Sequence, residues 1–124
     1  MKRRIFTLGL IIFLAVLILG GCGHTSCRDG QVELSVSAYS GQGKTASGRP
    51  TGPGICACGP RYPFGTRFDI PGVGTCVCYD RGSAVTNNHL DIWVPSWEEA
   101  KAFGRKTLTV TVHCPTRNGD DHDK

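Results

Sequence analysis

Two pairs of cysteines, each pair separated by a single residue, narrow the folds that this chain of 124 residues can adopt. Cys56 and Cys58 form one pair, and Cys76 and Cys78 form the other. In an extended strand, residues two apart point to the same face, so each pair presents two sulfurs to one side. This spacing favours disulfides between strands, because structural zinc sites usually use a longer spacing that lets two cysteines curl round one ion. A zinc site with four cysteine ligands remains the competing interpretation.

The first residues of the chain indicate export, which decides whether disulfides can form. Lys2, Arg3 and Arg4 precede an apolar stretch at residues 8–19 that only glycine interrupts, as in a secretory signal peptide. The alternative is an uncleaved transmembrane helix, but about 15 apolar residues fall short of the ~20 that span a bilayer. We therefore expect residues 1–21 to be removed and the remaining chain to reach a compartment where disulfides persist.

Cys22 is expected to anchor the exported chain to a membrane. It follows Leu19, Gly20 and Gly21, a sequence that resembles the lipobox of bacterial lipoproteins, in which small residues precede a cysteine that is acylated and exposed by cleavage. The resemblance implies several acyl chains, palmitate among them, which hold a membrane more durably than one chain does. Residues 22–30 then form a polar tether, and the domain lies in the cell envelope, facing the periplasm or extracytoplasmic space.

The exported part of the chain carries little net charge. Cleavage removes three of the 14 basic residues, which leaves 11 basic against 10 acidic side chains and a formal charge near +1. A nucleic acid partner is not indicated, because nucleic-acid-binding domains are usually strongly basic. Since roughly 100 residues bury one modest core, we expect a single monomeric domain at residues 31–115, followed by a charged tail at 116–124.

Six cysteines remain after Cys22, an even number that allows three disulfides. We expect Cys27 to pair with Cys114, because that bridge ties the start of the first predicted strand to the end of the last. The other two bridges link one closely spaced cysteine pair to the other, and the choice of partners stays open. No cofactor and no metal are expected.

Alternation of apolar and polar residues predicts a strand at residues 32–39, in which Val32, Leu34 and Val36 share one face. The residues that follow, 40–54, are rich in glycine, serine and threonine and predict a surface loop that lines a groove. Shorter strands are predicted between glycine and proline residues, at 55–58, 66–70, 75–79, 90–94 and 108–114.

One helix is predicted beyond these strands. Ser96 and Glu99 fit a capping box, and Gly104 supplies a left-handed stop. Of the two tryptophans, Trp93 and Trp97, we expect one to lie in the core. Many short strands with a single helix predict an all-β fold, and closure into a small β-barrel would leave no strand edges exposed.

Two aspartates are the strongest candidates for chemistry. Asp80 ends one predicted strand, and Asp91, eleven positions later, opens the next. A loop that returns on itself could bring both carboxylates to one end of the barrel. On the residues alone, however, Asp-Arg-Gly is also an ordinary turn sequence, and Asp91 could act as a cap or pair with Arg81. His89 and His113 are weaker candidates for a direct role.

The surroundings of these aspartates resemble a known cell-wall module, the 3D domain, which is named for three aspartates. The resemblance rests on Asp-Arg-Gly-Ser at 80–83, Leu-Asp-Ile at 90–92 and the Glu-Ala and Phe-Gly pairs at 99–104, with Tyr39 and Pro-Phe-Gly-Thr at 63–66. The chain is similar also to rare lipoprotein A, to the catalytic domain of membrane-bound lytic transglycosylase A, and to expansins. The resemblance covers most of the exported chain and implies a six-stranded double-psi β-barrel.

The same resemblance implies a lytic transglycosylase, which cleaves the bond between N-acetylmuramic acid and N-acetylglucosamine in peptidoglycan and leaves a 1,6-anhydro sugar. One acid suffices, because the sugar's own primary hydroxyl attacks the anomeric carbon. By resemblance the acid is Asp91, which would act first as acid and then as base. Its apolar neighbours Leu90 and Ile92, and the carboxylate of Asp80, are the influences that raise the pKa of such a group. Asp80 would position the sugar or keep Asp91 protonated.

Further residues are expected to contact the glycan. By resemblance, Tyr39 and Thr45 hydrogen-bond the substrate or the catalytic acid. Arg81 either contacts an anionic muropeptide or pairs with an aspartate, and Trp93 offers a ring on which a sugar could stack.

One feature of the 3D domain is missing. The family usually carries its first aspartate in a sequence such as Ala-Val-Asp-Pro-Arg, whereas this chain reads Ala-Cys-Gly-Pro-Arg at 57–61, with Gly59 in place of the aspartate. Rare lipoprotein A and expansins also lack that residue, and expansins loosen walls without hydrolysis. The competing function is therefore a non-catalytic, expansin-like lipoprotein that binds peptidoglycan through the same groove.

Overall fold

The computed structural model describes residues 27–116. The predicted signal peptide at 1–21, the predicted lipidation site Cys22 and nearly all of the predicted tail lie outside these residues. Within 27–116, no helix combines the length and the apolar character that crossing a membrane requires.

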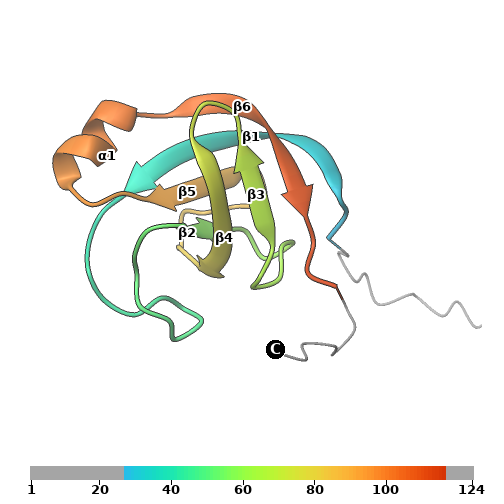
Figure 1. The fold of residues 1–124 in the computed structure, drawn as a ribbon, viewed down its shortest axis with the longest axis horizontal. Coiled ribbons are helices and arrows are strands. Elements are labelled where there is room, and N and C mark those ends of the chain that lie inside the picture. Colours follow the sequence, from blue (N-terminus) through green and yellow to red (C-terminus); the bar gives the residue numbers. More distant parts are fainter. Residues whose placement is uncertain (1–26, 117–124) are drawn as a thin grey trace, which may run out of the picture.

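Within residues 27–116, six strands close into one barrel and one short helix is present, which confirms the expected all-β fold. Around the barrel the order is β1-β5-β2-β4-β3-β6, with parallel pairing between β1 and β5 and between β2 and β4 (Figure 1). In chain order the elements are β1 (Gly30–Tyr39), β2 (Ile55–Cys58), β3 (Arg67–Ile70), β4 (Gly74–Asp80), β5 (His89–Trp93), α1 (Trp97–Phe103) and β6 (Lys106–His113).

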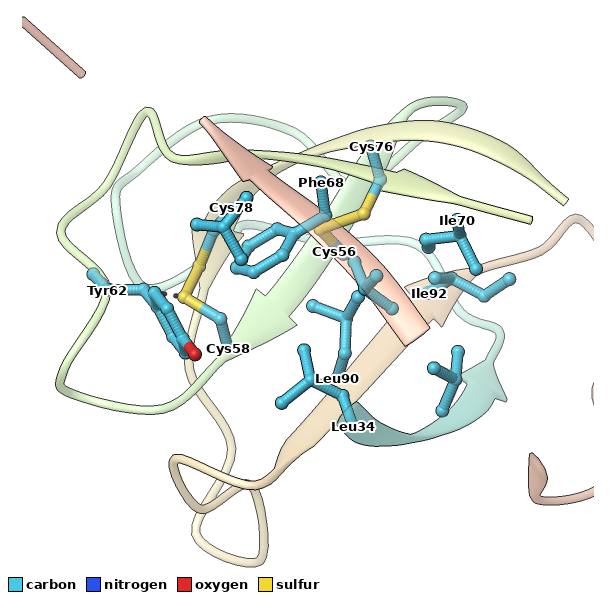
Figure 2. Close-up of a cluster of buried hydrophobic side chains, with 13 residues drawn as sticks. Leu34, Cys56, Cys58, Tyr62, Phe68, Ile70, Cys76, Cys78, Leu90 and Ile92 are labelled. Atoms are coloured by element: carbon cyan, nitrogen blue, oxygen red, sulfur yellow. Dashed lines mark hydrogen bonds between the residues drawn. A yellow bond between two sulfur atoms is a disulfide. The ribbon is translucent and has the colours of Figure 1, made fainter. Parts of the chain in front are cut away.

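The barrel interior is filled by the inward-facing residues of the strands, as their alternating sequences predict. On β1, Leu34 and Val36 are buried, whereas the residues between and after them are partly exposed. Phe68 of β3 is fully buried, and its ring meets the ring of Tyr62 edge to face, with 5.1 Å between centroids. Figure 2 shows this cluster, in which Ile92 and Ile70 lie close together. The core therefore lies inside the barrel, and any site must lie on its outer face or at its ends.

Three disulfides hold the barrel. Cys56 pairs with Cys76 and Cys58 with Cys78, so both bridges join β2 to its parallel neighbour β4 inside the core (Figure 2). Cys27 pairs with Cys114 and ties the approach to β1 to the residue after β6. The disulfide interpretation of the cysteine spacing is confirmed and the zinc interpretation is wrong, because all four of its candidate ligands are oxidised in pairs.

Helix α1 follows its predicted signals closely. The hydroxyl of Ser96 accepts a hydrogen bond from the backbone N–H of Glu99 at 3.2 Å and donates to the Glu99 carboxylate at 3.0 Å. The reciprocal bond of the capping box thus closes on the serine hydroxyl rather than on the serine backbone. Gly104 ends the helix with a φ of 66°, and Ala100 is buried where α1 packs against β1.

The expectation that one tryptophan lies in the core is wrong. Trp97 is 62% exposed, because it stands in the first turn of α1, whose buried residue is Ala100. Trp93 is half-buried and faces away from the core, since β5 turns Leu90 and Ile92 inward. Its indole N–H donates to the carbonyl of Gly41 at 2.7 Å, so the ring is fixed against the loop that joins β1 to β2.

Candidate functional site

Strand β2 brings the two aspartates to one face of the barrel. Ala57 of β2 is the pairing partner of Asp80 on β4 and, on its other side, of Asp91 on β5. Cys56 and Cys58 belong to the core cluster, so Ala57 between them faces away from the core, and so do its partners. Two strand spacings separate the aspartates, which corresponds to roughly 10 Å between their Cα atoms. We call this outward surface, made by Ser37, Tyr39, Ala57, Asp80 and Asp91, the aspartate face.

An irregularity in the pairing of β2 with β4 decides which residue of β4 reaches the aspartate face. Cys56 pairs with Cys78, but the next residue, Ala57, pairs with Asp80, so Tyr79 is passed over. A bulge of this kind inserts one extra residue and re-aims the residues beyond it. Without it, the strict alternation of a strand would turn Asp80 to the same side as Cys78, into the core.

Asp80 is held by three donors. Tyr39 Oη donates to Asp80 Oδ2 at 3.1 Å, and the backbone N–H groups of Ala46 and Arg81 donate to Oδ1 at 2.9 Å and 2.8 Å. Through these bonds Asp80 fixes the loop at 40–54 against the end of β1. Burial, together with the negative charge of Asp80 and the hydrogen bond to it, raises the pKa of Tyr39 far above its ordinary value, so Tyr39 remains a donor.

Asp91 has a different environment. It is half-buried, and its Oδ1 accepts one hydrogen bond, from Ser37 Oγ at 3.0 Å. The hydrogen bonds of the described residues leave its Oδ2 without a partner. Burial raises the pKa of Asp91 above its ordinary value, and the charge of Asp80 adds to this; the Ser37 hydroxyl and the charges of His89 and Arg105 act in the opposite direction. Burial therefore favours the protonated form of the Asp91 carboxyl group.

Thr45 and Tyr39 do not reach Asp91 in the structure. Thr45 is buried in the loop at 40–54, and its hydroxyl is bonded to that of Ser47 at 2.9 Å. Tyr39 bonds Asp80, as described above. The partner that Asp91 has instead, Ser37, did not stand out in the sequence. The alternation of side chains along β1 was the sequence pattern that could have pointed to Ser37, because it puts Ser37 on the same outward face as Tyr39.

Arg81 neither pairs with an aspartate through its guanidinium nor points to the aspartate face. Nη1 donates to the carbonyls of Cys58 and Gly59 at 3.1 Å and 3.2 Å, and Nη2 donates to that of Tyr62 at 2.7 Å. The group lies over the ring of Phe64 at 4.4 Å, and burial lowers its pKa. Arg81 thus fixes the turn after β2, which corrects the expectation of a pair with aspartate.

Gly59 occupies a position that has no room for a side chain. A Cβ atom there would lie 2.5 Å from the backbone nitrogen of Asn87 and 2.5 Å from the carbonyl carbon of Thr86. Asn87 is itself fixed, because its Oδ1 accepts a hydrogen bond from the backbone N–H of Arg61 at 2.8 Å. The loop between β4 and β5 therefore fills the space that the first aspartate of the 3D pattern would need.

The described residues thus form a small closed barrel, and its two aspartates lie on one outer face, on either side of strand β2. Among known protein families, residues 56–113 match the family model of the 3D domain. That range contains both aspartates and Gly59, whereas Ser37, Tyr39 and Thr45 precede it.

Two curated proteins of Bacillus subtilis are similar to part of the chain. Cell wall-binding protein YocH is 36% identical over 50 residues, which is 40% of this chain and 17% of YocH. Putative cell wall shaping protein YabE is 30% identical over 50 residues, 40% of this chain and 12% of YabE. The chain thus spans less than a fifth of the length of either relative.

Proposed function

We propose that this chain acts on the bacterial cell wall as a lytic transglycosylase, with peptidoglycan glycan strands as its substrate. The observation that carries the proposal is the state of Asp91: a half-buried carboxyl group with a raised pKa and one oxygen free to meet a ligand. Such a group suits general acid catalysis, because it keeps its proton at a higher pH than an exposed aspartate does. The names of both relatives, which refer to the cell wall, support the choice of substrate.

The proposed reaction needs one carboxyl group. Asp91 gives its proton to the oxygen that links N-acetylmuramic acid to N-acetylglucosamine, and the bond from that oxygen to the anomeric carbon breaks. The primary hydroxyl of the same muramic acid residue then bonds to the anomeric carbon and closes the 1,6-anhydro ring. Its proton passes to the Asp91 carboxylate, which restores the acid. No water enters, so a second carboxylate is not required as base or nucleophile.

The neighbours of Asp91 would shape the substrate groove. Asp80 would act through position, since it fixes the loop at 40–54 and, by its charge, supports the protonated form of Asp91. Trp93 faces outward on the same strand as Asp91 with its indole N–H fixed, so it offers a rigid ring for a sugar. Tyr39 and Thr45 would border the groove from β1 and the loop. Arg81 is not among the proposed substrate contacts, because its guanidinium already donates hydrogen bonds to backbone carbonyls.

The experiment that tests the activity is mass spectrometry of the products released from purified sacculi. Wild type should release anhydro-muropeptides, and Asp91→Asn should reduce their formation at least by the ~10²-fold that loss of acid catalysis costs, while still binding sacculi. Asp80→Asn should cost less, since its role is to position and to tune. Undiminished formation by Asp91→Asn would transfer the role of acid to Asp80.

A second candidate is non-catalytic binding of the cell wall, as the name of cell wall-binding protein YocH suggests. Gly59 favours it, because the space for the first aspartate of the 3D pattern is filled by backbone. On this alternative, wild type, Asp91→Asn and Asp80→Asn all bind sacculi alike, and none releases anhydro-muropeptides. The same experiment therefore separates the two functions.

The lipid anchor at Cys22 places this activity at a membrane surface in the proposal, with the chain working as a monomer. The test is Cys22→Ser in the full chain, followed by membrane fractionation and by mass spectrometry of the N-terminus. We expect the variant to be soluble in the envelope or to remain an uncleaved precursor. Unchanged processing and unchanged membrane association would contradict the anchor.

A further inference from the structure

A continuous line of polar contacts runs from Asp91 into the protein. Ser37 Oγ lies 3.0 Å from Asp91 Oδ1 and 2.6 Å from His89 Nε2. The other ring nitrogen, Nδ1, lies 3.4 Å from the carbonyl oxygen of Ala84, at the far end of the line. His89 is only 8% exposed, so bulk water can do little to replace these partners.

The strands make this arrangement. Ser37 is the pairing partner of Asp91 across the parallel pair of β1 and β5, and His89 stands two residues before Asp91 on the same face of β5. Ser37 therefore has the carboxyl group beside it and the imidazole diagonally across, both within hydrogen-bonding distance.

A serine hydroxyl has a single hydrogen to donate, so of its two neighbours one must donate to it. A carboxylate cannot donate. While Asp91 is ionised, Ser37 must give its hydrogen to Asp91 Oδ1, and His89 must carry a hydrogen on Nε2 and donate it to Ser37. The same directions hold when Asp91 is protonated on Oδ2, since Oδ1 still accepts. The chain of donors thus stays unchanged through a cycle in which only Oδ2 gains and loses a proton.

We propose that Ser37 and His89 are positioning residues that commit Oδ1 of Asp91 to accepting a hydrogen bond and so reserve Oδ2 as the oxygen that exchanges a proton with the substrate. The inference rests on the proposed function for its catalytic meaning, but the direction of the hydrogen bonds can be measured without it. His89 acts through Ser37 and does not touch the substrate.

The other groups near Asp91 are compatible with this direction. The charge of Asp80 raises the pKa of Asp91 and that of Arg105 lowers it, whereas the Tyr39 hydroxyl donates its hydrogen to Asp80. Ser37 as a donor lowers the pKa of Asp91, whereas Ser37 as an acceptor from a protonated Oδ1 would raise it. The sign of the change after removal of Ser37 therefore reports the direction of the bond.

The first measurement is the tautomer of His89 in wild type, read from the ¹⁵N chemical shifts of its ring by NMR. We expect a hydrogen on Nε2; a second hydrogen on Nδ1, directed at the carbonyl of Ala84, is compatible with the proposal. A hydrogen on Nδ1 with a lone pair on Nε2 would overturn the proposal, because Ser37 would then have to donate to His89. This measurement needs no variant and no substrate, so it decides the proposal even if no glycan cleavage is found.

The second measurement follows the ¹³C signal of the Asp91 carboxyl group during a pH titration. Ser37→Ala should raise the pKa of Asp91, and Ser35→Ala, on the same face of β1, should leave it in place. A lowered or unchanged value in Ser37→Ala would overturn the proposal. The expected size is about half a pH unit or more, which is what one net hydrogen bond corresponds to.

The third measurement is the rate of release of anhydro-muropeptides, for which Ser37→Ala should lower kcat about 10-fold with little change in KM. His89→Gln keeps an N–H donor near the position of Nε2 and should retain more of kcat than His89→Leu. Equal losses in His89→Gln and His89→Leu, with both variants folded, would argue for a purely structural role and against the proposal.

Discussion

Ionisation of Asp91 destabilises the folded state relative to the unfolded chain. Because burial raises its pKa, the folded chain holds the proton of Asp91 more tightly than the unfolded chain does. For a group of this sign, the contribution to stability is complete below the unfolded pKa and is lost as the pH rises through the folded pKa. Under the proposed function, the protonated carboxyl group that acid catalysis needs therefore costs stability once Asp91 ionises.

We accordingly expect Asp91→Asn to be more stable than wild type at neutral pH, with a difference that vanishes in acid. The amide keeps an acceptor for Ser37 but cannot ionise. Urea denaturation at several pH values measures the effect, and Glu33→Gln, at an exposed position of β1, controls for the change in net charge. A variant that is less stable than wild type at neutral pH would show that the ionised form of Asp91 is favoured by folding.

At the scale of single residues, sequence patterns found the candidate acid but not its support. Asp91 stood out through its spacing from Asp80 and through the resemblance to the 3D domain, since on the residues alone it could equally have been a cap or a partner of Arg81. Ser37 did not, because an outward serine in a strand is ordinary and its partner depends on the register of β1 against β5. That register joins residues 54 positions apart, which no local pattern encodes.

Among the elements, the strands and the helix were predictable because alternation and caps are local. Strand β2 has its predicted bounds at Ile55–Cys58, and α1 begins after its predicted cap, Ser96. The bulge that turns Asp80 to the outer face was not predictable, since it is a property of the pair β2 and β4. The position of Arg81 was not predicted either. Its guanidinium donates to backbone carbonyls of a turn, and every residue has such a carbonyl, so the side chains of the sequence do not reveal these acceptors.

The packing of the loop before β5 over Gly59 leads to a prediction at this scale. Gly59→Ala should lower the free energy of unfolding by about 1–3 kcal/mol, as overpacking does, because the added Cβ meets the backbone at Thr86 and Asn87. Denaturant unfolding measures the loss. Gly43→Ala is the matched control, since nothing lies within 4 Å of a Cβ built there. Equal stability of the two variants would mean that the loop at 86–87 yields easily.

On the scale of the whole molecule, the site exists only when the barrel is closed. The aspartate face draws Ser37 and Tyr39 from β1, Ala57 from β2, Asp80 from β4 and Asp91 from β5, and these strands are neighbours around the barrel although they are far apart in sequence. The cysteine count and the expected compartment predicted that closure would be held by disulfides. The choice of Cys56 with Cys76 and Cys58 with Cys78 could not be made in advance, because it follows from the parallel pairing of β2 and β4.

The bridge between Cys27 and Cys114 is the one that should act mainly on the unfolded chain. It links residues 87 positions apart, so it encloses the whole barrel sequence, whereas each inner bridge links residues 20 apart. In the folded state its two ends are already held side by side by the antiparallel pairing of β1 with β6. Removing the bridge therefore takes little from the folded barrel and restores much freedom to the unfolded chain.

We expect the double variant Cys27→Ser, Cys114→Ser to fold into the same barrel, with a free energy of unfolding lowered by about 4.6 kcal/mol, the value that chain entropy assigns to a loop of this length. Because the unfolded chain becomes less compact, the dependence of that free energy on denaturant concentration should steepen. Guanidinium titration followed by near-ultraviolet circular dichroism measures both quantities. A loss below about 1 kcal/mol with an unchanged slope would mean that the unfolded chain is already confined by the two inner bridges, since these join β2 to β4 near the middle of the sequence.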